Sequence, residues 1–418
     1  MTAISLPFVL VLALLSSCIE LEISAPSFPD IMNQLQVSET MVGLTITYNL
    51  VGIFIASLIY GPVSEYYGRR RIMLIGNAIL AIGAMGCVLT PSIEWLLVSR
   101  FIQGFGAATS AVIVSVIISD VYTTDRAAKL YGVMNAVFTI FMALAPVLGG
   151  FINASIGWRG NYGIVAVLCA ISWLVLFFFL PETRPINEKI AKEELEGGDS
   201  EKPTNKRSPS RGTGLSKVIR DYKRLLTSFL FMSTATVPSL LYGCYMTFVA
   251  IAPFIYMKAF NFAIMTYTIH QGIILSSFAI MSQFSGKITE WLGVRKTISM
   301  SLGLYGFGAT LMLFPNTAYI LTFAMTLLST SAAFLYPIVF ARSIEVFPDI
   351  KGTASSAIMS LRYLLCSGIT GMGSYLYDGK PIMLGIVVFC VTIVIITLTV
   401  NIQKRLGDVD EISHSPAT

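Results

Sequence analysis

The chain has 418 residues, of which 55% are hydrophobic and only 12% are charged. Ordinary soluble domains are about 45–50% apolar and about 25% charged, because polar groups must cover a surface that faces water. This composition excludes a soluble enzyme and indicates that most of the protein surface faces lipid.

Twelve apolar segments are long enough to cross a membrane as helices, since one span needs about 20 apolar residues. We predict spans at 4–24, 41–60, 72–90, 95–118, 130–152, 161–180, 228–253, 266–285, 297–314, 319–341, 353–375 and 382–400. No basic residue precedes the first apolar run, which favours a retained first span over a cleaved signal peptide. The predicted fold class is an all-α membrane protein with twelve transmembrane helices.

Basic residues collect in alternate loops and in the long polar stretch. Such loops stay cytoplasmic, so we predict a multi-pass protein with both termini cytoplasmic. The net charge of +5 then reflects topology, and no nucleic-acid partner is expected. The six cysteines lie in apolar spans without metal-site spacing, so we expect no metal site and no disulfide framework. No nucleotide-binding motif is present, and we expect no cofactor.

The polar stretch 181–224 separates six spans from six. We therefore predict an N-terminal half at 1–180, a cytoplasmic linker at 181–224 and a C-terminal half at 225–418. The composition of the stretch 181–224 is typical of a partly disordered tether. The alternative for 214–224 is an amphipathic helix on the membrane surface.

An internal repeat supports this division. The sequence GPVSEYYGRRR follows the second span, and GKITEWLGVRK follows the eighth. The residues at matched places are Gly61 and Gly286, Glu65 and Glu290, Gly68 and Gly293, and Arg70 and Arg295. Parallel repeats packed around a central site are typical of secondary transporters.

These two loops resemble motif A of the major facilitator superfamily. Three further segments resemble motifs of that family. The Arg-x-x-Gln-Gly motif is matched by Arg100, Gln103 and Gly104, and the antiporter motif is matched by Pro146, Gly149 and Gly150. A segment of the bicyclomycin-resistance (Bcr/CflA) drug:proton antiporters is matched by Glu22, Pro26 and Pro29. The resemblance covers the chain except the linker. It implies two pseudo-symmetric six-helix halves that work by alternating access. Phe141 and Ala145 replace glycines of the antiporter motif, which favours symport relative to antiport.

Four charged residues lie inside predicted spans: Glu20, Glu22, Arg100 and Arg362. A charge inside the membrane costs several kcal/mol unless it is hydrated, paired or neutralised by a proton. Glu20 and Glu22 lie about 200° apart around a helix, so they should face different directions. The family correspondence favours Glu22 as the primary coupling acid, with Glu20 as its partner, whereas the polar stripe of Ser17, Glu20 and Ser24 favours Glu20. The resemblance implies a role in proton transfer for Arg100.

The hypothesis is that protonation of a span-one glutamate loosens its tie to Arg100 and lets the halves move. The alternatives are an acid near the outer interface and an arginine that snorkels there. For Arg362 two roles stay open. It binds a substrate carboxylate or phosphate, or it pairs with Glu20 or Glu22.

The other predicted substrate contacts combine aromatic, amide and thioether groups, which suit varied amphipathic ligands: Tyr48, Asn49, Gln103, Tyr242, Tyr245 and Met246. The predicted gating residues are helix-packing glycines, a proline and loop charges: Gly61, Glu65, Gly68, Arg69, Arg70, Pro146, Gly149, Gly150, Gly286, Glu290 and Gly293. The resemblance implies that Glu65 interacts with the positive N-terminal end of span eleven, near Gly352 and Thr353.

The predicted function is a proton-coupled secondary transporter of the cell inner membrane that exports small amphipathic molecules, as in multidrug efflux. Its partners would be a small-molecule substrate, protons and membrane lipid, and we expect a monomer. One alternative is a proton symporter that imports an anionic metabolite or siderophore. A second is a transport-dead receptor on the same fold. An intramembrane enzyme is disfavoured, since the only histidines are His270 and His414 and no hydrolase motif is present.

Overall fold

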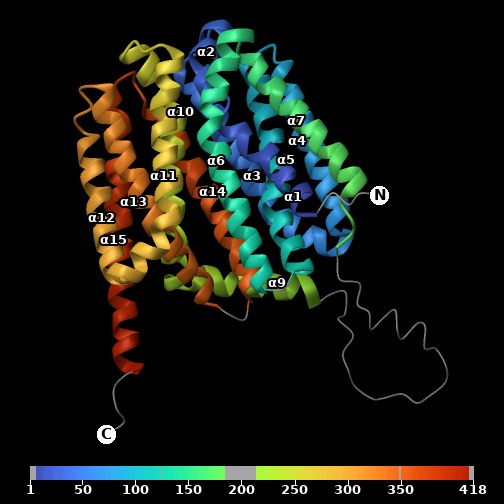
Figure 1. The fold of residues 1–418 in the computed structure, drawn as a ribbon, viewed down its shortest axis with the longest axis vertical. Helices are drawn as coiled ribbons and strands as arrows, with labels where there is room; N and C mark the ends of the chain where they lie inside the picture. The colour runs from blue at the N-terminus through green and yellow to red at the C-terminus, as the bar shows by residue number, and fades with distance from the viewer. Residues whose placement is uncertain (1–5, 123, 184–212, 348–349, 414–418) are drawn as a thin grey trace, which may run out of the picture.

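The computed structural model describes residues 6–122, 124–183, 213–347 and 350–413. Within them the regular structure is helical, and twelve helices have 17 or more residues (Figure 1). These long helices are α1 (Leu6–Glu22), α3 (Glu39–Tyr67), α4 (Arg69–Val88), α5 (Ile93–Val121), α6 (Thr124–Ile156), α7 (Trp158–Phe179), α10 (Phe229–Phe254), α11 (Ile264–Leu292), α12 (Val294–Leu311), α13 (Ala318–Glu345), α14 (Lys351–Leu376) and α15 (Pro381–Ser413). Each predicted span falls on one of them.

Ten segments of this bundle are long and apolar enough to cross a membrane by themselves. The predicted spans on α12 and α14 are not among those ten, yet both helices are part of the bundle, α12 at its left edge in Figure 1. α14 packs against α3 and α10, and α12 packs against α13 and α15. Neighbouring helices therefore cover part of their less apolar surface. The chain is a multi-pass membrane protein.

The ends of the long helices follow local chemistry. Ser38, Ser92 and Ser228 each accept a hydrogen bond from the backbone N–H three residues later, as N-cap residues do. Gly68 between α3 and α4 has a φ of 90°, and Gly293 between α11 and α12 has a φ of 81°. Glycine adopts this conformation at little cost, so the predicted repeat corresponds to the same sharp turn in both halves.

The first span breaks where two prolines follow its acids. α1 ends at Glu22, a short 3₁₀ helix η1 spans Ala25–Ser27, and α2 spans Phe28–Leu35. Pro26 and Pro29 lie in the first turns of η1 and α2, where a missing backbone N–H costs little. Glu22 is consequently placed at a helix end.

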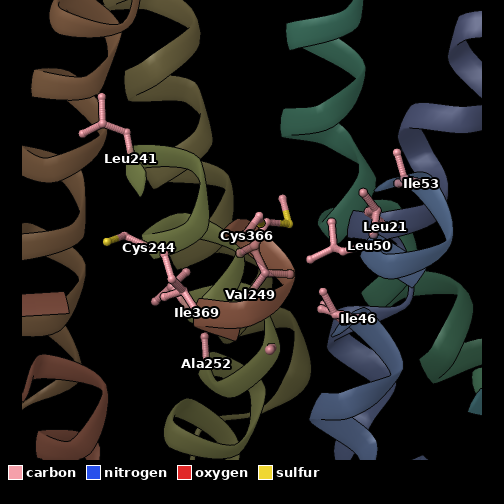
Figure 2. Packing of buried hydrophobic residues seen from close by; sticks show 14 of the residues in the cluster. Leu21, Ile46, Leu50, Ile53, Leu241, Cys244, Val249, Ala252, Cys366 and Ile369 are labelled. Carbon is pink, nitrogen blue, oxygen red and sulfur yellow. The ribbon is translucent and has the colours of Figure 1, made fainter. Parts of the chain in front are cut away.

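The two six-helix groups lie side by side in Figure 1, the first on the right and the second on the left. They meet where α3 packs against α14 and where α6 packs against α11. Figure 2 shows buried apolar side chains of both groups at this junction, Leu21 and Leu50 among them from the first and Val249 and Cys366 from the second. The core is therefore continuous across the halves.

A separate helix, α9 (Thr213–Thr227), runs across one end of the bundle (Figure 1). We call this the linker end, and the end that carries α2 the opposite end. Leu225 of α9 is buried in a cluster with Phe231, Ala354 and Ile358, and Tyr222 packs against that cluster. The helix of the alternative for 214–224 is thus confirmed, whereas its position on the membrane surface stays a prediction. The tether was predicted for 181–224, and most of that stretch, 184–212, lies outside the described residues.

One glycine fixes how closely α3 and α5 approach. A Cβ at Gly104 would lie 2.0 Å from the backbone oxygen of Asn49, whereas a Cβ at Gly303 of α12 would meet nothing within 4 Å. Gly104→Ala should therefore force α3 and α5 apart and destabilise the protein by about 1–3 kcal/mol, the usual cost of overpacking. Thermal unfolding in detergent measures this, with Gly303→Ala as the matched control. Equal unfolding temperatures for the two variants would contradict the packing described.

Candidate functional site

The two acids of α1 are both fully buried and contact different halves of the protein. Glu20 contacts residues of α3 and α5, and Glu22 contacts residues of α10 and α11. Their two-residue spacing on α1 explains this divergence, as the sequence predicted.

Glu20 forms a buried ion pair with Arg100. The guanidinium Nη1 lies 2.7 Å from Glu20 Oε2, and neither side chain is accessible to solvent. Asn49 Nδ2 donates to both carboxylate oxygens, at 3.0 and 3.1 Å, and Arg100 Nη1 also donates to Gln103 Oε1 at 2.8 Å. The interpretation of Arg100 as a snorkelling side chain is therefore wrong, because the side chain has a buried partner.

Asn49 and Gln103, which we predicted as substrate contacts, belong to this network. Their amides orient the Glu20 carboxylate and the Arg100 guanidinium, and both residues have no exposed surface. The whole network lies on α1, α3 and α5 of the first half. Loosening the tie to Arg100 would thus act first within one half and not between the two.

Glu22, unlike Glu20, forms hydrogen bonds that cross from the first half to the second. Its Oε1 accepts a hydrogen bond from the Tyr245 hydroxyl of α10 at 3.0 Å, and its Oε2 accepts one from Gln271 Nε2 of α11 at 3.0 Å. Among the described residues Glu22 has no cationic partner. Tyr245 was predicted to be at the site. Gln271 was not, because a single glutamine in an apolar helix belongs to no motif.

Arg362 of α14 lies in a cage of aromatic rings. It donates to the Tyr336 hydroxyl, and its guanidinium carbon lies 5.1 Å from the Tyr336 ring centre and 5.9 Å from the ring centres of Tyr242 and Phe340. Within the described part of the chain it forms no ion pair, and its buried Nε has no hydrogen-bond partner. The predicted alternative that Arg362 pairs with Glu20 or Glu22 is therefore contradicted in this conformation.

Two further predicted substrate contacts, Met246 and Tyr48, lie in different environments. Met246 is fully buried in the main apolar cluster. Tyr48 is 41% exposed and makes no hydrogen bond or ring contact with other described residues. Tyr48 therefore lies apart from both acids, although it directly precedes Asn49.

At the linker end, the motif A loop of the first half is held by charged groups. Arg69 forms an ion pair with Asp120 at 3.1 Å and donates to Ser64 Oγ at 2.6 Å. Glu182 accepts hydrogen bonds from the backbone N–H groups of Arg69 and Arg70, at 2.8 and 3.2 Å, and so caps the N-terminus of α4. Asp120 was not predicted, because it belongs to no motif that we recognised, and Glu182 was assigned to the linker.

The remaining gating predictions stay untested. Glu65, Glu290, Gly286 and Gly293 are exposed, and Glu65 makes no hydrogen bond or ion pair with described residues. A Cβ at Gly61 would lie 3.8 Å from Ser356 of α14. In α6, Pro146 is buried, a Cβ at Gly149 would lie 2.1 Å from the Ile23 oxygen, and one at Gly150 would lie 2.6 Å from Thr268 of α11.

At the opposite end, polar and aromatic contacts also join the halves. Lys258, in the π-helical turn η2 (Ile255–Ala259) that follows α10, forms an ion pair with Glu39 at the start of α3. The rings of Phe28 and Phe254 lie 6.2 Å apart between centres. In this conformation the halves are thus linked both at Glu22 and at the opposite end.

The profile of the Major Facilitator Superfamily matches residues 10–371. The chain belongs to this family. Its twelve-helix fold in two pseudo-symmetric halves is therefore the family fold, and the protein is a membrane transporter of small molecules and not an enzyme.

Known proteins with similar sequences support this family membership. The chain is 26% identical to the uncharacterized transporter YdgK of Bacillus subtilis, over 87% of each chain. It is 23% identical to the multidrug resistance protein MdtL of Shigella flexneri, over 92% of this chain and 93% of the relative. A bicyclomycin resistance protein homolog of Haemophilus influenzae is 28% identical over 44% of this chain and 46% of its own. The resemblance to drug-resistance transporters is thus confirmed at low identity.

A solved structure of a bacterial homolog of the human lysosomal transporter Spinster, inward-facing and occupied, has the same fold. Its TM-score is 0.71 at 15% identity, covering 98% of each chain.

The buried ion pair leads to a stability prediction. Glu20→Gln removes the partner of Arg100 and leaves an uncompensated buried charge, so the free energy of unfolding should fall by about 3–5 kcal/mol. The double variant Glu20→Gln/Arg100→Gln should recover part of this loss, because both charges are gone.

Thermal unfolding in detergent measures both variants. Glu94→Gln is the control, since Glu94 is exposed at the start of α5. A double variant that is less stable than Glu20→Gln would contradict the pairing.

Proposed function

We propose that this protein is a proton-coupled secondary transporter of the cell inner membrane that exports small amphipathic molecules in exchange for protons. It works as a monomer in lipid, has both termini in the cytoplasm and uses no cofactor. The proton gradient drives it, and multidrug efflux is the physiological process. Similarity to the multidrug resistance protein MdtL and to the bicyclomycin resistance protein homolog supports drug export.

The observation that carries the proposal is the position of Glu22. It is a fully buried carboxyl group without a cationic partner among the described residues, and its two hydrogen-bond donors come from the other half. Hydrogen bonds to a charged acceptor are roughly twice as strong as those between neutral groups. An ionised Glu22 therefore holds Tyr245 and Gln271 firmly and keeps the two halves together.

Protonation removes the charge of Glu22 and weakens both hydrogen bonds. A cationic group on a substrate achieves the same by taking the carboxylate for itself. Either protonation or binding of a cationic substrate releases the contact between α1 and the second half. When neither has occurred, Glu22 is ionised and the contact is kept. Because the proton and the substrate use the same carboxylate, they exclude each other, and this competition produces exchange.

Glu20 and Arg100 have a supporting role in this mechanism. Their charges cancel, and Asn49 and Gln103 hold them in place. The pair keeps the Glu22 end of α1 attached to α5, so that a change at Glu22 moves the first half as a body.

A second candidate function is proton symport that imports an anionic metabolite or siderophore. Arg362 favours it, since its charge has no acidic partner among the described residues. The two functions differ in the direction of proton movement. In an antiporter, substrate added outside drives protons in the direction opposite to substrate, and in a symporter the two move together.

Reconstitution into liposomes that contain a pH-sensitive dye tests the proposal, with cationic, zwitterionic and anionic amphipathic compounds as substrates. Glu22→Gln should reduce substrate-dependent proton movement at least about tenfold, because it removes the titrating group and a charge-assisted interaction of about 1.5–3 kcal/mol. The exposed Glu94→Gln should behave as wild type.

Three results discriminate between the candidates. Proton movement that survives in Glu22→Gln would contradict coupling at this residue. Co-directional movement of proton and substrate would support symport in place of antiport. No transport of any compound by a folded wild-type protein would support the receptor alternative.

A further inference from the structure

Two charged groups in the membrane interior lack an oppositely charged partner among the described residues. Glu22 is held by neutral donors, and Arg362 is held by the Tyr336 hydroxyl and aromatic rings. The other two intramembrane charges, Glu20 and Arg100, neutralise each other. The uncompensated charges are thus one acid from the first half and one base from the second.

Helix α10 contributes a contact to each of these two charges. The ring centre of Tyr242 lies 5.9 Å from the guanidinium carbon of Arg362. Tyr245, three residues further along the same helix, donates to Glu22. Residues three apart lie on the same side of a helix, so one face of α10 connects the acid to the base.

We propose that this face of α10 is a binding site for zwitterions, in which Arg362 receives a carboxylate and Glu22 receives an ammonium group. This inference rests on the proposed function, since it names the substrate class of the same site. A zwitterion compensates both charges at once, whereas a proton compensates only Glu22. The charge of Arg362 is therefore compensated when the zwitterion is bound and uncompensated when the proton is bound. In this respect Arg362 distinguishes the two states.

The chemistry at Arg362 favours a carboxylate over a phosphate. A guanidinium presents its N–H donors as a planar fork that matches the two oxygens of a carboxylate. Tyr336 accepts one of these donors and the Nε–H has no partner. A phosphate brings a second negative charge, and no other uncompensated cation of the described structure lies at this site to balance it beside Glu22.

The rings around Arg362 indicate that the body of the substrate is flat and apolar. Tyr336 and Phe340 stack at 5.6 Å with an angle of 10° between their planes, and Tyr242 meets Tyr363 edge to face at 6.3 Å. Such walls bind aromatic groups through their faces and edges. An aromatic ring that carries an ammonium group at one end and a carboxylate at the other supplies one group for Glu22, one for Arg362 and one for the rings.

Equilibrium binding to the purified protein tests the inference without any gradient. The probes share one benzene ring: para-aminomethylbenzoate is a zwitterion, its primary amide is a cation, and its N-acetyl derivative is an anion. Calorimetric titration of the wild type should show the zwitterion binding at least about tenfold more tightly than either of the others, as expected for a charged hydrogen bond.

The variants assign each end of the probe. Arg362→Gln should abolish the preference for the zwitterion over the amide, and Glu22→Gln should abolish the preference over the N-acetyl compound. Tyr336→Phe keeps the ring and removes the hydroxyl, so it should change the first ratio in a protein that folds normally. Arg342→Gln, an exposed arginine on α13, is the matched control and should preserve both ratios.

The inference is overturned if wild type binds the amide as tightly as the zwitterion, or if Arg362→Gln leaves that ratio unchanged. Its failure is distinguishable from failure of the proposed function. Retained binding preferences without proton movement in liposomes would reject only the coupling. Proton coupling with an unchanged Arg362→Gln ratio would reject only the substrate class.

Discussion

The contact between Glu22 and the second half of the protein is the interaction on which this account depends. A carboxylate inside a membrane is costly, and the usual remedy is an adjacent cation. Glu22 has instead two neutral donors, Tyr245 and Gln271, which the other half supplies. In the proposed mechanism the charge state of Glu22 thereby controls the contact between the two groups of helices.

Glu20, the other buried acid of α1, shows how a cation stabilises a carboxylate inside the membrane. Glu20 is paired with Arg100 and held by Asn49, and all three groups are buried within the first half. A pair of this kind is costly to disrupt and is therefore poorly suited to change in every cycle. The two acids of α1 thus divide the work. In the proposed mechanism Glu20 keeps α1 attached to its own half, and Glu22 responds to protons and substrate.

Much of the fold was predictable from sequence because its signals are local. Apolar length placed twelve helices, and the internal repeat placed Gly68 and Gly293 at matched positions, where both adopt a positive φ. The spans on α12 and α14 were harder to predict, since these helices are less apolar and neighbouring helices cover part of their surface. The charged residues were conspicuous because an apolar background leaves so few of them.

The partners of those charges were less predictable, because they come from distant segments. Gln271 lies 249 residues from Glu22 and has no motif around it. Tyr48 and Asn49 are adjacent, yet one is exposed and the other is buried in the Glu20 network. In a membrane helix the lipid-facing side and the buried side are both apolar, so the pattern that separates them in soluble proteins is weak. Glu182 was assigned to the linker since only the folded chain brings it to α4.

The most direct test of the account measures the distance between the halves at the opposite end while pH changes. Spin labels at Gln36 after α2 and Asn261 after η2 occupy exposed positions on the two sides of that end. As the pH is lowered, the distance in wild type should increase when Glu22 takes up a proton, because a neutral carboxyl group holds Tyr245 and Gln271 less firmly. In Glu22→Gln it should be long at every pH, and His270→Gln should respond like wild type, because the response belongs to Glu22. A pH response that persists unchanged in Glu22→Gln would contradict the account.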